Sequence, residues 1–198
     1  MAQLLAKPYW YLRHGETDWN KQGLSQGRTD IALNETGLAQ ARSAGLLLAE
    51  HWRDGALPIA RIVSSPLSRA LVTAEIARDQ IAAHGGPRLE ITTDRDLQEV
   101  CFGEQEGEPM GSWYDPWIAG EMTPEGGESF AELRDRGTAA LNRALAGEGV
   151  PLVVCHGAMF RALRSAMGLP ANVRLANAAP LRVTPPENGR GWEIETFS

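Results

Sequence analysis

The chain has 198 residues, enough for one substantial hydrophobic core and short for two, so we expect a single domain over residues 1–198. Its hydrophobic content of 43% and charged content of 22% are typical of a globular protein. The net charge of −6 argues against a nucleic-acid-binding protein, because binding to a phosphate backbone needs a basic face.

No apolar stretch approaches the length of a membrane span, and Met1–Lys7 has neither the apolar core nor the cleavage site of a signal peptide. We therefore expect a cytoplasmic protein with no membrane partner. Its two cysteines, Cys101 and Cys155, lie far apart and lack metal-ligand spacing, so we expect free thiols.

Apolar and amphipathic segments alternate along the chain. In chain order, the patterns predict a strand at 9–12, a helix at 38–52, a strand at 59–63, a helix from 66 to about 83, a strand at 89–93, a helix from 129 to about 146, a strand at 150–155, a helix at 157–167 and closing strands at 181–183 and 192–196. A polar stretch at 18–36 and a loop-rich stretch at 94–128 carry no such pattern.

Two helix starts have clear signals. Ser65 is a predicted N-cap with Pro66 as the first helical residue, and Ser129 with Glu132 predicts a capping box. The alternation as a whole predicts an α/β protein with three layers, α/β/α, around a mostly parallel sheet. Its binding crevice should lie outside the carboxyl ends of the strands.

Cationic and imidazole side chains follow three of these strands. Arg13 and His14 follow the first, Arg69 lies in the helix after the second, and His156 with Gly157 follows the fourth apolar strand. Because the carboxyl ends of parallel strands meet at one edge of a sheet, we expect these groups to lie together.

Two arginines beside the helix start at Ser65 indicate a site for a tetrahedral dianion, since guanidinium binds phosphate bidentately and free helix amides point at it. A histidine in such a cradle can attack phosphorus through one ring nitrogen if the other keeps its proton. We expect His14 to be this nucleophile, oriented by the backbone approach that Gly15 allows. We expect His156 to donate to the phosphoryl oxygens, helped by the amide of Gly157.

Hydrolysis also needs a proton for the departing alkoxide, and a carboxylic acid kept protonated by its surroundings can supply it. Glu99 lies in a semi-apolar loop after the third predicted strand. We expect Glu99 to be this acid and then to activate water against the phosphohistidine.

These motifs, in this order, resemble the histidine phosphatase superfamily in its phosphoglycerate mutase-like branch, branch 1. The residues that carry the resemblance are Arg13-His14-Gly15-Glu16-Thr17, Asn20, Gly27, the segment 64–70, Glu99, Gly103, Glu106-Gly107, the segment 126–129 and His156-Gly157. They cover the chain from Tyr9 to beyond Met167 in family order.

The resemblance implies a phosphoglycerate mutase-like fold with a short cap at 104–128, and no cofactor or metal. It implies that His14 is the phosphorylated nucleophile and Glu99 the acid and base. The phosphate pocket implied by the family is Arg13, Arg69 and His156, with Asn20 and Gly27 as nearby contacts. Glu16 is similar to a family residue that supports the pocket without reacting.

The resemblance leaves two activities open, phosphatase and cofactor-dependent phosphoglycerate mutase. Mutases of the family carry basic residues after the acidic catalytic residue, where they hold the substrate's carboxylate and second phosphate. Here no Lys or Arg occurs between Arg95 and Arg134, the segment looks shorter than a mutase cap, and Gln26 stands where mutases usually have a hydroxyl residue. These departures favour a phosphatase acting on a monoester.

The same segment is acidic, and we expect it to repel a strongly anionic substrate, although surface glutamates commonly face water. Its acidic residues are Glu104, Glu106, Glu108, Asp115, Glu121 and Glu125. Its aromatic residues Trp113, Tyr114 and Trp117 fit either a packing cluster, the commoner case, or a cage for an apolar leaving group. Cys155 points opposite to His156 along a strand, which argues against a Cys-His nucleophile pair.

Two other classes of protein stay open. A metal-dependent hydrolase could use His14, His156 and Glu99 as ligands, but their spacing is not that of helical metal sites and the arginines would repel a cation. A non-catalytic phospho-ligand binding module is the second, although such modules arise when the nucleophile is lost and His14 and Glu99 are both present.

The expected partner is a small-molecule phosphate ester. Its identity stays open among phosphoglycerate, phosphoserine, sugar phosphates, a nucleotide or α-ribazole phosphate, and a phosphoprotein. The oligomeric state is also open, with a homodimer among the alternatives.

Overall fold

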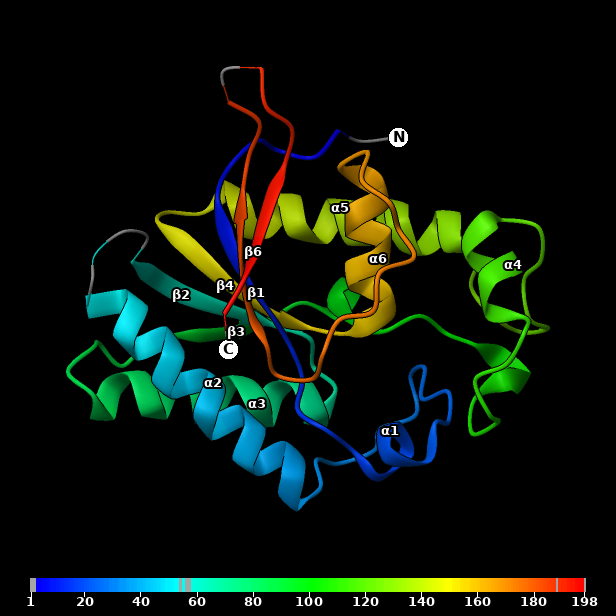
Figure 1. Ribbon diagram of the computed structural model, residues 1–198, viewed down its shortest axis with the longest axis horizontal. Helices are drawn as coiled ribbons and strands as arrows, with labels where there is room; N and C mark the ends of the chain where they lie inside the picture. Colours follow the sequence, from blue (N-terminus) through cyan, green and yellow to red (C-terminus); the bar gives the residue numbers. More distant parts are fainter. Residues whose placement is uncertain (1–2, 54, 56–57, 188, 198) are drawn as a thin grey trace.

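Six strands pair into one mixed sheet at the centre of the molecule: β1 (Tyr9–Arg13), β2 (Ile59–Ser64), β3 (Ile91–Thr93), β4 (Val150–Cys155), β5 (Pro180–Thr184) and β6 (Glu193–Thr196). Their order across the sheet is β3-β2-β4-β1-β5-β6 (Figure 1). Strands β1 to β4 run parallel, whereas β5 and β6 are antiparallel to their neighbours. The prediction of a mostly parallel sheet is confirmed.

The computed structural model describes residues 3–53, 55, 58–187 and 189–197, so the first two residues of Met1–Lys7 lie outside the described part. No helix in these ranges is both long and apolar enough to cross a bilayer. Cys101 and Cys155 are both free thiols.

Helices cover both faces of the sheet. On one face lie α2 (Glu35–Arg53) and α3 (Ser68–Ala83), below the sheet in Figure 1, and on the other lie α5 (Phe130–Ala146) and α6 (Gly157–Ala166). Side chains of β1 alternate between the two faces of the sheet. Trp10 and Leu12 pack with α2 and α3, while Tyr9 and Tyr11 pack with α5 and α6. This is the predicted three-layer α/β/α arrangement.

Short helices occupy the stretches in which the sequence pattern predicted none. Helix α1 (Asp18–Gln22) lies in the polar stretch and has a capping box between Thr17 and Asn20. The loop-rich stretch contains the 3₁₀ turns η1 (Arg95–Leu97) and η2 (Gly103–Gln105) and helix α4 (Tyr114–Ala119). These elements are too short to show a helical period in the sequence.

One predicted helix start is confirmed and one is wrong. Ser129 and Glu132 form the capping box of α5. Helix α3 begins at Ser68, two residues later than predicted, because Leu67 is extended (φ −63°, ψ 135°). Its first turn is closed by Asp30, whose Oδ1 accepts from the amide and the hydroxyl of Ser68 at 2.8 Å each. A carboxylate therefore occupies the helix start that we expected to face a phosphate.

Candidate active site

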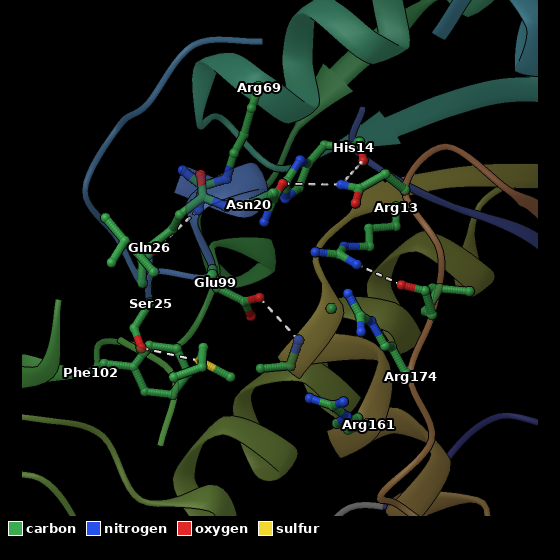
Figure 2. Close-up of a pocket in the computed structure, with 18 of the residues that line it drawn as sticks. Arg13, His14, Asn20, Ser25, Gln26, Arg69, Glu99, Phe102, Arg161 and Arg174 are labelled. Atoms are coloured by element: carbon green, nitrogen blue, oxygen red, sulfur yellow. Dashed lines mark hydrogen bonds between the residues drawn. The ribbon is translucent and has the colours of Figure 1, made fainter. Parts of the chain in front are cut away.

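A cavity of about 470 Å³ lies where β1 and β4 end (Figure 2). The predicted site residues that line it are Arg13, His14, Glu16, Asn20, Gly27, Arg69, Glu99 and Gly157. His156 is buried behind the wall, with its ring centroid 5.3 Å from that of His14. The structure thus brings together residues that are up to about 140 positions apart in the chain, as the strand order required.

His14 directly follows β1, and its orientation is set on both sides. Its main-chain N–H donates to the carbonyl oxygen of Cys155 in β4 at 3.0 Å. Its ring Nδ1 lies 2.7 Å from the carbonyl oxygen of Gly15. Because a carbonyl can only accept, Nδ1 carries the ring proton, and Nε2 keeps its lone pair for another group.

Gly15 has no room for a side chain. A Cβ at this position would lie 2.3 Å from the carbonyl oxygen of Gly37 at the start of α2. The amide of Gly15 also donates to Thr73 Oγ1 in α3 at 3.1 Å. The missing side chain therefore lets α2 close against the strand end, and the same residue's carbonyl holds the ring of His14.

Burial lowers the pKa of His14 well below its ordinary value of 6.5, and the cationic Arg69 and Arg13 lower the pKa further. The same causes, burial first, lower the pKa of His156 well below 6.5. Both rings are therefore neutral near pH 7, the form in which a histidine nitrogen can act as a nucleophile.

We expect the His14 ring to stay neutral as the pH falls through 6.5, because a lowered pKa keeps the proton off until more acidic conditions. Ring ¹⁵N chemical shifts across a pH titration would measure this. Arg69→Gln removes one of the neighbouring positive charges and should raise the pKa of His14 toward 6.5. A ring that gains its second proton at or above pH 6.5 in the unliganded wild type would contradict the prediction.

Arg69 is fully buried in the first turn of α3 and is aimed by two carbonyl groups. Its Nη2 donates to Gly27 at 2.7 Å and its Nη1 to Thr29 at 2.8 Å. Gly27 has a φ of +52°, and a Cβ there would lie 2.0 Å from Oε1 of Glu106. Glu106 accepts from the amides of Arg28 and Thr29. Glu106 thus stabilises the 27–29 turn, and the carbonyl groups of this turn orient Arg69.

Arg13 continues β1 and reaches the opposite wall of the cavity. Its Nη1 donates to the carbonyl oxygen of Leu175 at 2.5 Å. A Cβ on Gly157 would lie 3.4 Å from its Nε, so the glycine gives the guanidinium its space. The Nε atoms of Arg13 and Arg69 are buried without a hydrogen-bond partner among the described residues.

Asn20 and Glu16 line the cavity from the segment that follows β1. Asn177 connects this segment to His14, because its Nδ2 donates to the carbonyl oxygen of His14 at 3.0 Å and to Asn20 Oδ1 at 3.1 Å. Glu16 Oε1 accepts from Asn34 Nδ2 at 3.0 Å. Both side chains are therefore fixed by amide groups from other parts of the chain.

His156 is held by Ser65, which we predicted to be a helix N-cap. Ser65 Oγ lies 2.8 Å from His156 Nε2, and the amide of Leu67 donates to the same hydroxyl at 3.3 Å. The Nδ1 of His156 is buried and has no hydrogen-bond partner among the described residues. Ser65 is thus not a helix cap, and the second ring nitrogen is left for a bound ligand.

Glu99 is bound by the N-terminus of α6. Its Oε1 accepts from the amides of Met159 and Val100, at 3.0 and 3.1 Å, and its Oε2 accepts from the amide of Ala158 at 3.0 Å. We expected the start of this helix, at Gly157, to assist a phosphoryl oxygen. The two amides after Gly157 bind Glu99, because a carboxylate satisfies the free amides and the dipole of a helix start, and the role of the Gly157 amide itself stays a prediction.

Arg136 in α5 holds the loop that carries Glu99. Its Nη1 donates to the carbonyl oxygens of Asp96 and Gln98, at 2.6 and 2.8 Å, and its Nε and Nη2 both pair with Glu128 at 2.7 Å. Only about 15% of the Arg136 side chain is exposed. This fork-shaped contact fixes the position of the Glu99 backbone.

The polar residues of the cavity that were not predicted include Arg161, Arg174 and Asn177. Arg161 lies one helical turn after Gly157 on the same side of α6, a spacing that could have indicated it. Arg174 and Asn177 belong to the irregular loop between α6 and β5, which has no period from which to infer a direction.

The prediction that the acidic 104–128 segment faces the substrate is wrong. All six acidic residues of the segment 104–125 are described by the structure, and none of them lines the cavity. Glu106 binds the 27–29 turn, as above, and Asp115 accepts from Asn172. The residues of this segment that do line the cavity are Met110 and Tyr114. The acidic side chains of this segment therefore do not form the cavity wall.

The aromatic trio mainly forms a packing cluster. Trp117 is fully buried, with its ring centroid 5.3 Å from that of Phe102 and 5.2 Å from that of Phe130. Tyr114 alone of the three lines the cavity. The three aromatic residues therefore do not form a cage around the leaving group. Tyr114 is the one whose side chain can contact a ligand in the cavity.

Cys155 is separate from the imidazoles. Its Sγ donates to the carbonyl oxygen of Leu97 at 3.0 Å on the α5 and α6 side of the sheet. Burial, with Glu99 as a smaller cause, raises the pKa of its thiol to about 12. As predicted, it forms no nucleophile pair with His156.

The fold and site together define an α/β protein of the phosphoryl-binding class, with guanidinium and imidazole groups gathered at the carboxyl ends of parallel strands. The family model of the histidine phosphatase superfamily (branch 1) matches residues 9–195. The chain therefore belongs to that superfamily.

Its relatives include proteins named as phosphatases and proteins named as probable phosphoglycerate mutases. The chain is 37% identical to the uncharacterized phosphatase PhoE of Bacillus subtilis, over 94% of this chain and 92% of the relative. It is 35% identical to the probable phosphoglycerate mutase GpmB of Proteus mirabilis, over 94% and 90% of the two chains. A mycobacterial glucosyl-3-phosphoglycerate phosphatase, solved with VO₃, is similar in structure with a TM-score of 0.78 at 25% identity, over 98% of each chain.

Proposed function

We propose that this protein is a phosphatase that hydrolyses a small phosphomonoester through a phosphohistidine on His14. The observation that carries the proposal is the hydrogen bond from His14 Nδ1 to the carbonyl oxygen of Gly15, which leaves Nε2 as a nucleophile in a cavity lined by arginines. Membership of a superfamily that contains phosphatases supports it.

In the first step, the lone pair of His14 Nε2 forms a bond to phosphorus, and the bond from phosphorus to the ester oxygen breaks. Arg13, Arg69 and His156 stabilise the charge on the other phosphoryl oxygens. The protonated form of Glu99 donates its proton to the departing oxygen. Of its two carboxyl oxygens, Oε2 accepts one amide and Oε1 accepts two, so Oε2 has the free position for that proton.

In the second step, Glu99 takes a proton from a water molecule, whose oxygen attacks phosphorus. The N–P bond breaks, its electron pair returns to His14 Nε2, and inorganic phosphate leaves. The atoms balance with water as the only co-reactant. Both ring nitrogens of His14 return to their starting state.

Access of water favours hydrolysis over transfer to a second substrate. The cavity wall includes Met110 and Arg174, which are both exposed, so solvent reaches the site past a short 104–128 segment. We therefore propose that this segment is a small cap that leaves the site open. The alternative, a cofactor-dependent phosphoglycerate mutase, is supported by relatives such as GpmB.

Incubation with a ³²P-labelled phosphomonoester tests the proposal. We expect an acid-labile label on His14 together with release of inorganic phosphate across a panel of monoesters. A parallel assay with phosphoglycerate and a bisphosphoglycerate primer distinguishes the mutase, because a mutase would form the isomeric phosphoglycerate. Ligand binding without label or turnover would indicate a non-catalytic phospho-ligand binding module.

We expect full activity in excess chelator and strong inhibition by vanadate, which mimics a five-coordinate phosphoryl group. Among the described residues, no group of three or more His, Cys, Asp or Glu side chains could hold a metal ion. The charges of Arg69 and Arg13, which lower the pKa of His14, would also repel a cation. Loss of activity in chelator, restored by a divalent metal, would support the metal-dependent hydrolase instead.

A further inference from the structure

Two arginines extend the cavity beyond the groups that the proposed reaction uses. Arg161 projects from α6, and Arg174 lies in the loop that follows this helix. In Figure 2, Arg13, Arg174 and Arg161 follow one another along one side of the cavity, across from Glu99. A volume of about 470 Å³ is comparable with pockets that enclose small organic ligands, about 300–1,000 Å³, and exceeds what one phosphoryl group needs.

No described carboxylate pairs with either arginine. Arg161 donates to the hydroxyl of Tyr114 and to the carbonyl oxygen of Val173, while Arg174 has no hydrogen bond or ion pair with a described residue. Arg143, another exposed arginine, shows the contrasting case, because it pairs with both Asp94 and Asp96. Two unneutralised guanidinium groups on the wall of one cavity therefore favour an anionic ligand.

Tyr114 adds a hydrogen-bond donor at the same place. Burial, opposed in part by Arg161, raises the pKa of its phenol to about 12, so the hydroxyl keeps its proton near pH 7. The hydroxyl oxygen accepts from Arg161 Nη1 at 2.5 Å, and the Arg161 guanidinium lies 4.8 Å from the ring centroid. The phenolic proton is therefore left to donate to a ligand.

We propose that Arg161, Arg174 and Tyr114 form a second anion subsite that binds a carboxylate or a second phosphate on the leaving group of the substrate. The inference rests on the proposed phosphatase function, which places the scissile phosphoryl group at His14. The substrate class is then a phosphomonoester whose alcohol portion carries its own negative charge. The 104–128 segment contains no Lys or Arg. The cationic groups of the proposed subsite come from α6 and the loop that follows it.

A matched set of ligands tests the subsite. Glycerol 3-phosphate, 3-phosphoglycerate and glycerol 1,3-bisphosphate share a three-carbon frame and differ in whether the far group is a hydroxymethyl, a carboxylate or a phosphate. We expect one or both anionic ligands to have a kcat/KM about tenfold or more above that of glycerol 3-phosphate. The two anionic arms show which group the subsite prefers.

Arg174→Glu should reverse this preference, because it replaces attraction by repulsion at an exposed position that has no hydrogen bond or ion pair with a described residue. The matched control is Arg42→Glu, the same change at an exposed arginine of α2 that does not line the cavity. The control should keep the wild-type ratio between the substrates with a charged far group and glycerol 3-phosphate, which separates a local contact from a change in net charge.

A binding measurement separates this inference from the proposed function. Calorimetry with the His14→Ala protein should show tighter binding of 3-phosphoglycerate or the bisphosphate than of glycerol 3-phosphate, with the difference lost in His14→Ala/Arg174→Glu. If neither 3-phosphoglycerate nor the bisphosphate binds more tightly than glycerol 3-phosphate, including the case of no binding at all, the subsite is overturned. Anion preference without phosphohistidine or turnover would leave the subsite supported and the phosphatase proposal wrong.

Discussion

His14→Ala is expected to lower kcat by at least about 10⁴-fold, leaving essentially no turnover. The substitution removes Nε2, the atom that would form the bond to phosphorus. The nearest thiol cannot replace it, because Cys155 bonds to the Leu97 carbonyl and has a pKa raised to about 12. His156 is buried behind the cavity wall and bonded through Nε2 to Ser65.

Steady-state hydrolysis and the ³²P label should disappear together in His14→Ala, while the far-UV circular dichroism spectrum should persist. His84→Ala is the matched control, because His84 is exposed at the end of α3 and its ring Nδ1 contacts the carbonyl oxygen of Gln80 in the same helix. That variant should behave as wild type. Comparable turnover in His14→Ala and wild type would refute His14 as the nucleophile.

The regular part of the fold could be predicted because its signals are local. The apolar runs of β1 and β4 and the amphipathic period of α5 are visible within a few residues, and the capping box at Ser129 needs only one turn of helix. Strand order then brought Arg13, His14 and His156 to one edge. Their convergence followed from topology and needed no knowledge of side-chain contacts.

What sequence reasoning missed depends on contacts between distant segments. Ser65 has the local pattern of an N-cap, but His156 takes its hydroxyl and Asp30 closes the helix start. The acidic 104–128 segment was expected to face the site, yet Glu106 satisfies the amides of the 27–29 turn. Charge alone does not give the direction of a side chain in an irregular segment, whereas a strand or helix period does.

Glu99→Gln is expected to lower kcat/KM by about 10² to 10⁴-fold for an alkyl phosphate, the usual contribution of a general acid. An amide has neither a proton to give the leaving alkoxide nor the basicity to activate water. Its NH₂ group also cannot accept from the amide of Ala158, so a structural cost of about 1–3 kcal/mol accompanies the chemical one. Loss of activity alone would therefore not identify the role of Glu99.

The leaving group separates the two contributions. p-Nitrophenol leaves without protonation, so Glu99→Gln should still form the phosphohistidine from p-nitrophenyl phosphate, while hydrolysis of that intermediate lacks its base. We expect a burst of nitrophenol and accumulation of label on His14, neither of which arises from a distorted site. Glu104→Gln, an exposed glutamate nearby in the chain, should show neither effect. An equal loss for alkyl and nitrophenyl esters without accumulated label would reduce Glu99 to a structural ligand of the α6 amides.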